Sequence, residues 1–401
     1  MIQTAKRIER VEEYYFSRKL AEVRRLDRPE LPVINLGIGS PDLAPSAETI
    51  RTLNESARVE HHHGYQSYKG IAPLRKAIAK WYESVYRVAL EPESEVLPLM
   101  GSKEGIFHIT MAFVNEGDEV LIPDPGYPTY ASATRLVGGV VRTYAMKESL
   151  RWGIDFEELS RQDLSKVKIM WVNFPHMPTG RVAEESEMQA LVELARKHKF
   201  LLVNDNPYSL ILNDEPSSLL SVPGAQDIAM ELNSLSKSHN MAGWRIGWAA
   251  GRREYIDAVL KVKSNLDSGM FLSLQHAAVE ALKSGPEWFE QLNVTYRSRS
   301  RAAKRILDEL DCQYYEKQSG LFLWAKVPSS VNDVEAWVDD ILYGTSVFVT
   351  PGTVFGEAGR RHIRISLCAP EATFVEALKR IQQWKAGAPD LNKRQPKMNA
   401  A

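Results

Sequence analysis

Residues 233–248 read NSLSKSHNMAGWRIGW, and this stretch decides the fold. It sets Lys237 between two serines, which compete with helical hydrogen bonding, and it carries Trp244 and Trp248, which favour burial. A plain surface helix would not have these neighbours. The stretch follows one short apolar run and enters another, so the sequence predicts that Lys237 lies close to the ends of buried strands.

Similar apolar runs recur between residues 95 and 251, and a helical pattern such as EESEMQALVELARKHK (184–199) separates them. Their alternation predicts an α/β fold with a mostly parallel sheet, and such sheets bind ligands beyond the carboxyl ends of their strands. After about residue 253 the chain becomes mostly helical and then α+β. We expect a large domain over 46–285 and a small domain built from 1–45 and 286–401. The runs are EVLPLM (95–100), EVLIPDP (119–125), KIMWVNFP (168–175), KFLLVND (199–205), IAMELNSLSK (228–237) and IGWAAG (246–251).

Composition excludes several classes of protein. The 401 residues carry 50 basic and 51 acidic side chains, a formal net charge of -1, so no charge surplus favours nucleic acid or an anionic membrane. No apolar run approaches the roughly 20 residues that a membrane span needs, and the N-terminus lacks the apolar core of a signal peptide. Cys312 and Cys368 have no metal-ligand spacing, which fits a reducing compartment. We therefore expect a cytoplasmic protein with no metal, whose first helix docks through Ile8, Val11 and Tyr15.

Two turns carry polar groups where strands end. Gly101, Ser102 and Lys103 lie between a predicted strand and a helix, so free N–H groups and the helix dipole would form a seat for an anion such as phosphate. Asp205 and Tyr208, in VNDNPYSLIL (203–212), follow a strong apolar run. For that stretch alone an ordinary turn is the favoured interpretation, and a carboxylate aimed at a cationic ligand is the alternative.

Residues 233–248 supply the further hydrogen-bond donors and the amine that those two turns lack. Ser234, Ser236 and Arg245 would complete a phosphate cage, the arginine as a two-pronged donor. Lys237 would then place its amine beside the phosphate, where burial and nearby cations lower a lysine pKa and make it a nucleophile toward carbonyls. A phosphorylated aldehyde cofactor fits all three stretches.

With these motifs the sequence resembles the pyridoxal-phosphate-dependent aminotransferases of class I and II, fold type I, in the aspartate aminotransferase superfamily. The resemblance runs from INLGIGSPD (34–42) to HIRISLC (362–368) and rests on S-x-S-K with the downstream G-W-R-I-G, on D-x-x-Y and on the late R-I-S. It implies a large domain with a mostly parallel sheet of seven strands between helices. It also implies a homodimer that moves an α-amino group from an L-amino acid to a 2-oxo acid.

The resemblance assigns a role to each matching residue. Lys237 would hold pyridoxal 5'-phosphate covalently, Asp205 would pair with the ring nitrogen, and Tyr208 would donate to the phenolic oxygen. Tyr127 would stack on the ring. The phosphate would be held by Ser102, Lys103, Ser234, Ser236, Arg245 and, from the partner subunit, Tyr65. The substrate side would be formed by Arg364, which grips the α-carboxylate, with Ile38, Gly39 and Asn173.

One position departs from the family's pattern. Relatives carry N-P-T-G after the fourth strand, whereas this chain reads NFPHMPTG (173–180), with Met177 in place of the asparagine that bonds the phenolic oxygen. A thioether is a weak acceptor and no donor, so this hydrogen bond is lost. The pKa of the lysine-linked coenzyme should therefore be higher than with asparagine.

Other features fit plain interpretations, and other reactions stay open. The three histidines in HHHG (61–64) cannot all face one metal ion, and KSNLDSGMF (263–271) is either a helix break or a segment near the partner's substrate. Met270 and Phe271 would favour an apolar substrate if they faced the pocket, and no second arginine for an acidic substrate is identifiable. The alternative hypotheses are a β-lyase, decarboxylase or racemase on the same scaffold, or a non-enzymatic coenzyme-binding regulator, against which the absence of a preceding DNA-binding segment counts.

Overall fold

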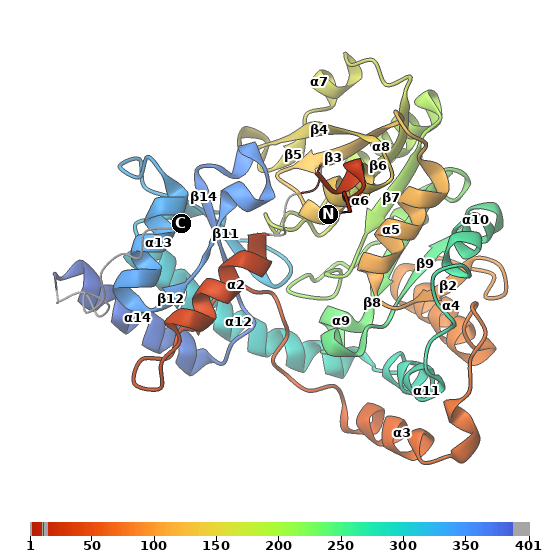
Figure 1. Ribbon diagram of the computed structural model, residues 1–401, viewed down its shortest axis with the longest axis horizontal. Coiled ribbons are helices and arrows are strands. Elements are labelled where there is room, and N and C mark those ends of the chain that lie inside the picture. The colour runs from red at the N-terminus through yellow and green to blue at the C-terminus, as the bar shows by residue number, and fades with distance from the viewer. Residues whose placement is uncertain (1, 10, 12–14, 388–401) are drawn as a thin grey trace.

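A computed structural model describes residues 2–9, 11 and 15–387 of the chain (Figure 1). A large sheet with its helices occupies one side of the picture, and a smaller α+β part, formed by the C-terminal third together with helix α2, occupies the other. The long helix α12 (Pro286–Glu309) runs along the lower edge of the smaller part toward the large one.

The large sheet has the strand order β2-β9-β8-β7-β6-β3-β4-β5. Strands β8, β7, β6, β3 and β4 are parallel neighbours, whereas β9 runs antiparallel to both β8 and β2. The seven expected strands are joined at the edge by an eighth, the two-residue β5, which pairs with β4 as an antiparallel extension. The bounds are β2 (Val96–Leu99), β3 (Glu119–Asp124), β4 (Val140–Lys147), β5 (Gly153–Ile154), β6 (Val167–Val172), β7 (Leu201–Asp205), β8 (Ala229–Ser234) and β9 (Gly247–Gly251).

Buried side chains cover both faces of this sheet, as the continuous apolar runs predict. One face packs against α5, α6 and α10 around a core that includes Trp171 and Val203, and the other belongs to the larger core that continues into the small part. The helices of this region are α3 (Ala47–Ala57), α4 (Ala72–Tyr86), α5 (Ser102–Phe113), α6 (Pro128–Leu136), α7 (Phe156–Ser160), α8 (Glu185–His198), α9 (Leu235–Ser238), α10 (Arg253–Lys263) and α11 (Leu272–Ala281).

The small part holds a four-stranded antiparallel sheet of order β10-β11-β14-β13, covered by helices α12, α13 and α14. Strand β1 (Ile34–Asn35) pairs in parallel with β12 (Val347–Phe348), which joins the N-terminal segment to the C-terminal part. The remaining bounds are β10 (Gln313–Tyr314), β11 (Phe322–Lys326), α13 (Val334–Thr345), β13 (Thr350–Pro351), β14 (His362–Ser366) and α14 (Glu371–Lys385).

The N-terminal segment docks, but of the three residues that the sequence predicted only Tyr15 packs against the core. Helix α2 (Tyr15–Leu26) begins only at Tyr15, while Ile8 lies half exposed in the short α1 (Lys6–Glu9) and Val11 lies in a bend. The expected single stripe is therefore wrong: α2 buries Phe16 and Val23 instead.

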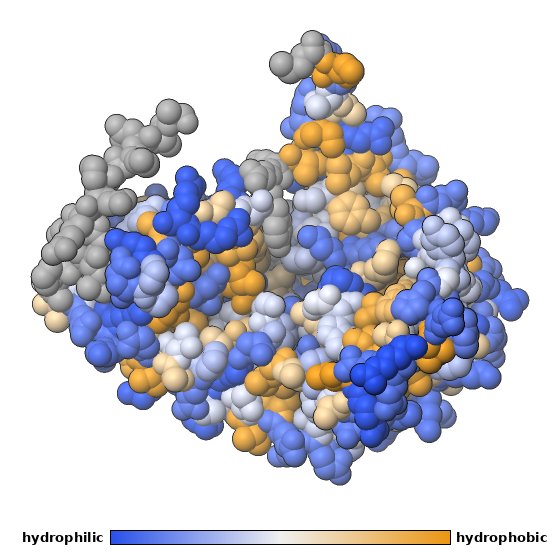
Figure 2. Space-filling view, turned by 60° about the horizontal axis from the view of Figure 1, so that its bottom comes forward, coloured by the Kyte–Doolittle hydropathy of each residue, from blue (hydrophilic) through white to orange (hydrophobic). Residues whose placement is uncertain are grey.

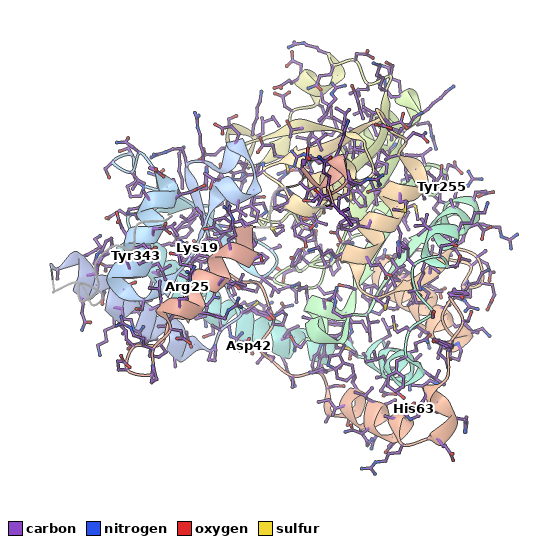
Figure 3. The ribbon with its side chains drawn as sticks, viewed as in Figure 1. Lys19, Arg25, Asp42, His63, Tyr255 and Tyr343 are labelled. Carbon is purple, nitrogen blue, oxygen red and sulfur yellow. The ribbon has the colours of Figure 1, made fainter. Side chains whose placement is uncertain are left out.

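Charged groups fix α2 to α13. The buried Lys19 binds Asp339 at 2.5 Å and Glu22 at 3.0 Å, and the Tyr343 hydroxyl donates to Glu22. Figure 3 shows Lys19 and Tyr343 facing each other from these two helices. Among the described helices, none combines the length and the apolar character that a bilayer crossing requires.

Candidate active site

A cavity of about 530 Å³ lies between the large sheet and the small part. It is bounded by the ends of β7 and β8, the start of α5, the N-terminal loop and α2. Every candidate coenzyme or substrate residue named above lines it, with the exception of Tyr65. Its lining comprises Phe16, Leu20, Ile38, Gly39, Ser102, Lys103, Tyr127, Tyr130, Asn173, Met177, Asp205, Pro207, Tyr208, Ser234, Ser236, Lys237, Ala242, Arg245, Phe322, Phe355 and Arg364.

Lys237 lies on the four-residue helix α9, directly after β8. Its Nζ donates a hydrogen bond of 2.6 Å to the carbonyl oxygen of Gly39. Burial lowers the pKa of this amine, and the nearby Arg364 and Arg245 lower it further. An amine of lowered pKa is more often neutral and can attack a carbonyl carbon.

The loop that meets Lys237 needs glycine at position 39. A Cβ there would lie 2.2 Å from the Phe322 ring, so any side chain would push the loop away from the lysine. The same loop is held from the other side, because Arg299 of α12 binds both oxygens of Asp42 at 2.6 and 2.8 Å. The small part thereby fixes the backbone that contacts Lys237.

Asp205 ends strand β7 and lies at one end of the cavity. Its Oδ2 accepts a hydrogen bond of 3.0 Å from Tyr130, while its Oδ1 is buried and accepts none from the described residues. Burial raises the pKa of this carboxyl to about 7; the charge of Glu231 adds to the rise, while the hydrogen bond from Tyr130 and the charge of Lys237 oppose it. A buried acceptor without a donor is costly, so Oδ1 is poised for a ligand that brings an N–H.

The opposite end of the cavity presents donors. Helix α5 begins at Ser102, so its first N–H groups point out of the helix, and Gly101 before it has a φ of 91°. A Cβ on Gly101 would lie 2.1 Å from Nη2 of Arg245, which shows how closely the arginine approaches this turn. Ser234 Oγ is buried and has no hydrogen-bond partner within the described chain. Burial and the charge of Arg245 lower the pKa of Lys103.

Arg364, on β14, forms the third side and is only 4% exposed. Its Nη2 donates to the Gly37 carbonyl at 2.7 Å, and its guanidinium carbon lies 3.9 Å from the ring centre of Phe322 and 4.6 Å from that of Phe355. Two aromatic faces thus orient the planar cation by cation–π contact. Its backbone partner is Gly37, next to the expected Ile38 and Gly39.

Met177 lies against this arginine. Its Sδ is 3.3 Å from Arg364 Nη1, so the thioether keeps a contact with the arginine although it offers no hydrogen to a ligand. Its backbone N–H donates to Asn173 Oδ1 at 2.7 Å, and the Asn173 side chain donates in turn to the Asp205 carbonyl. The segment 173–177 is therefore tied to the end of strand β7.

Tyr208 and Tyr127 lie on either side of the space between these groups. Burial raises the pKa of Tyr208 far above its ordinary value, and its ring meets that of Phe322 edge to face at 5.9 Å. Tyr127, immediately before α6, packs edge to face on Tyr130 at 5.6 Å. The Tyr208 hydroxyl stays protonated at neutral pH and can donate.

Three features noted in the sequence lie outside the cavity. Tyr65 is 92% exposed, and His61 to His63 form the turn η1 (Glu60–His63) at its side. Met270 and Phe271 do not line the cavity either; Phe271 packs on the ring of His63 at 5.6 Å. The condition under which Met270 and Phe271 would select the substrate, that they face the pocket, is therefore not met within one chain.

Sequence reasoning missed five side chains of the lining that matter for its character: Phe16, Leu20, Tyr130, Phe322 and Phe355. The four apolar ones belong to segments whose hydrophobic pattern looks the same whether a residue faces core or cavity. Tyr130 had a usable signal, because it follows Tyr127 by only three positions, and the two rings meet at the start of α6.

One cluster outside the cavity has side chains at metal-ligand distances, namely Glu104, His108 and Asp267. The buried Lys263 already binds both oxygens of Asp267 at 2.7 Å, and Glu104 lies 3.0 Å from the ring of His108. The Lys263 ammonium thus already balances the charge of Asp267, and these side chains form a polar cluster beside α5 and the end of α10.

The cavity fits a phosphorylated aldehyde with a basic ring nitrogen. The buried, unpartnered Asp205 Oδ1 suits a ring N–H, the opposite end gathers helix N–H groups, a serine hydroxyl and Arg245, and the Lys237 amine lies between them.

Comparison with known proteins agrees with this chemistry. The family model "Aminotransferase class I and II" matches residues 32–381, so the chain belongs to that family. It is a pyridoxal-phosphate-dependent aminotransferase of fold type I, which transfers an amino group from an amino acid to a 2-oxo acid.

Among its relatives is the LL-diaminopimelate aminotransferase of Aquifex aeolicus, 38% identical over 88% of this chain and 92% of that protein. The enzyme of the same name from Dehalococcoides mccartyi is 37% identical over 96% and 99%. Among solved structures, substrate-bound BacF from Bacillus subtilis superposes with a TM-score of 0.90 at 32% identity, over 96% of this chain and 98% of BacF.

Proposed function

We propose that the amino-group donor is an L-amino acid with a large apolar side chain. The observation that carries this proposal is the wall of Phe16, Leu20, Phe322 and Phe355 around Arg364. Within the described lining the only arginines are Arg364 and Arg245, and Arg245 lies at the phosphate end. A second carboxylate would meet rings and a leucine, where burying its charge is costly.

A second candidate donor is LL-diaminopimelate, because the curated relatives at 34–38% identity carry that substrate in their names. Its distal ammonium and carboxylate would need polar partners beyond the apolar wall. A partner subunit could supply them. An apolar donor needs only the apolar side chains around Arg364, whereas LL-diaminopimelate needs polar groups at the same place.

We propose the following roles for the pocket's residues. Pyridoxal phosphate supplies an aldehyde that captures the substrate amine and a ring that stabilises negative charge at the substrate α-carbon. Arg364 binds the α-carboxylate with two parallel N–H groups, and its stacking on Phe322 fixes the plane in which that carboxylate lies. Asp205 Oδ1 would accept the ring N–H, and Tyr208 would donate to the phenolic oxygen. Tyr127 would pack on the ring face.

Lys237 carries the proton. Its amine lies between the carbonyl of Gly39 and the cavity. Its lowered pKa leaves it neutral often enough to accept a proton from the substrate α-carbon, which it would then pass to the aldehyde carbon of the coenzyme. Phe16 and Leu20 of α2 line the cavity with apolar side chains, which would help to exclude water from this transfer. Ser102, Lys103, Ser234, Ser236 and Arg245 hold the phosphate.

We propose further that two chains share their active sites. Tyr65 and the segment 266–271 lie side by side, since the Cβ of a residue at 269 would touch the backbone of Gln66. Together they expose Tyr65, Leu266 and Phe271, and Figure 2 shows hydrophobic side chains interrupting the charged surface on the face that it views. In such a homodimer Tyr65 reaches the partner's phosphate. We also propose that the protein is cytoplasmic, and that the chain divides into a large domain over 46–285 and a small domain over 1–45 and 286–401.

One assay tests donor and chemistry together. The holoenzyme is incubated with single amino acids and no acceptor, and we expect loss of the lysine-linked coenzyme absorbance with release of one 2-oxo acid. Phenylalanine, methionine or leucine should react faster than LL-diaminopimelate and aspartate; the reverse order would overturn the apolar-donor proposal. Lys237→Ala should abolish turnover but retain some coenzyme, and normal turnover by this variant would refute the role of Lys237.

A further inference from the structure

Behind Asp205, on strand β8, lies a carboxylate that the reaction does not touch. Glu231 is 0% exposed and is paired in register with Asn204, the residue before Asp205. A fully buried glutamate is unusual unless its charge is compensated, so we expect hydrogen-bond donors around its carboxylate.

Four donors surround this carboxylate. Oε1 accepts from the hydroxyls of Tyr82 at 3.1 Å and Ser218 at 2.9 Å. Oε2 accepts from Asn204 Nδ2 at 2.9 Å and from the backbone N–H of Leu219 at 3.0 Å. An acceptor that receives four hydrogen bonds is best matched by the ionised carboxylate, because a proton on Glu231 would displace one of them.

Three of these four bonds hold the loop that carries Tyr208, whereas the fourth comes from Tyr82 on α4. Asn204 stands at the start of this loop, and Ser218 and Leu219 stand at its end, so Glu231 ties its two ends to the sheet. Asn204 also accepts from the N–H of Phe174 at 3.1 Å, which extends the network to the segment that ends in Met177. Both active-site loops therefore rest on one buried anion.

We infer that Glu231 is a positioning residue of the aminotransferase: it fixes the loops that bear Asp205, Tyr208 and Met177, and its negative charge strengthens proton binding at the ring nitrogen that Asp205 faces. The inference rests on the roles proposed above for Asp205 and Lys237. The charge acts across the sheet, because Asn204 and Asp205 are neighbours on one strand and their side chains point to opposite faces.

The titratable groups facing Glu231 are few among the described residues. Tyr82 and Tyr86 approach it from α4, and Asp205 approaches it from β7. Burial raises the pKa of both tyrosines far above neutrality, so neither changes charge between pH 5 and 9. Burial raises the pKa of Glu231 itself, and its hydrogen bonds from Asn204, Leu219 and Ser218 oppose that rise.

The variant Glu231→Gln separates charge from shape. Its carbonyl oxygen can accept from Asn204 and Leu219, and its amide can donate to the hydroxyl oxygens of Tyr82 and Ser218, which accept as well as donate. The hydrogen-bond geometry is kept and the charge is lost. Glu187→Gln is the matched control, since Glu187 is also buried but binds Arg181 and Ile154, away from the cavity.

The measurement is a pH titration of the visible absorbance of the lysine-linked coenzyme. In Glu231→Gln we expect its pKa to fall by about 1, as for a charge roughly 10 Å away at an effective dielectric constant near 20, and to stay unchanged in Glu187→Gln. A folded Glu231→Gln variant with the wild-type pKa overturns the inference, as does an equal fall in the control.

If Glu231→Gln does not fold, the triple variant Glu231→Leu, Tyr82→Phe, Ser218→Ala replaces it, since it removes the carboxylate together with the two hydroxyls that would otherwise be left unpaired. The negative charge is lost in this variant too, so the coenzyme pKa must again fall, and no change overturns the inference. Failure of the proposed function shows itself differently, because the wild type would then carry no titrating coenzyme on Lys237 at all.

Discussion

Replacing Asp205 by asparagine in the coenzyme-free protein should make that protein more stable at neutral pH. Asp205 is 5% exposed, and its pKa is raised from 3.8 to about 7, first by burial and then by the charge of Glu231. Because the folded pKa lies above the unfolded one, the stabilisation by this carboxyl is fully present below pH 3.8 and is lost as the pH rises through 7. At 1.36 kcal/mol per pKa unit the total loss is about 4 kcal/mol, and roughly 3 kcal/mol of it falls between pH 5 and 8.

Asparagine does not titrate and can still accept the hydrogen bond from Tyr130, so the variant escapes this loss. Urea unfolding of both apoproteins at pH 5, 6, 7 and 8 measures the difference in the free energy of unfolding, which should grow with pH in favour of the variant. With pyridoxal phosphate bound the order should reverse, because the ring N–H then pairs with the ionised carboxylate. Parallel apoprotein curves over this range would refute the assignment of Asp205 as a buried acid awaiting a cation.

Three further outcomes follow from the site. Met177→Asn should lower the pKa of the coenzyme absorbance, since the amide donates to the phenolic oxygen and the thioether does not; an unchanged pKa would discard this role. Arg364→Lys loses the two-pronged grip and its stacking on Phe322, so the KM for the amino acid should rise about 10- to 100-fold in steady-state assays while coenzyme affinity holds. Tyr65→Phe should weaken coenzyme retention about 2- to 10-fold by equilibrium dialysis of a dimer, and no change would remove Tyr65 from the phosphate site.

Whether the sequence could predict a residue of the cavity depends on how close that residue lies to the end of a strand. Lys237, Asp205 and Ser102 were predictable because each follows an apolar run, and the carboxyl ends of parallel strands meet at one edge. The group of hydrogen-bond donors at Ser102 and Arg245 was predictable for the same reason, since a glycine turn before a helix, with a lysine and an arginine close by, is typical of an anion site. The eight-stranded order itself, with β9 antiparallel, was not, because apolar runs do not reveal strand direction.

The apolar wall could not have been read from the pattern. Phe322 sits in a stretch that is buried throughout, and only the register of β11 on β14 turns it toward Arg364, while Phe355 is a single buried ring in a partly exposed turn. The N-terminal stripe failed for a related reason: Ile8 and Tyr15 share a helical spacing, but the helix begins at Tyr15, so the periodicity spans two separate segments. Periodicity gives a face and does not give the residue at which a helix starts.

The loop formed by residues 37–42 binds side chains that come from distant parts of the chain. Within residues 37–42, the carbonyl of Gly37 accepts from Arg364, the carbonyl of Gly39 accepts from Lys237, and Asp42 is clamped by Arg299. A substrate carboxylate that engaged Arg364 would therefore act on the same short backbone that accepts the hydrogen bond from Lys237. Figure 3 places Asp42 beside α12, where the N-terminal segment passes that helix. Because Arg299 also donates to the Leu367 carbonyl, three residues past Arg364, the clamp moves with the strand that carries the arginine, and the small part can position substrate and base together.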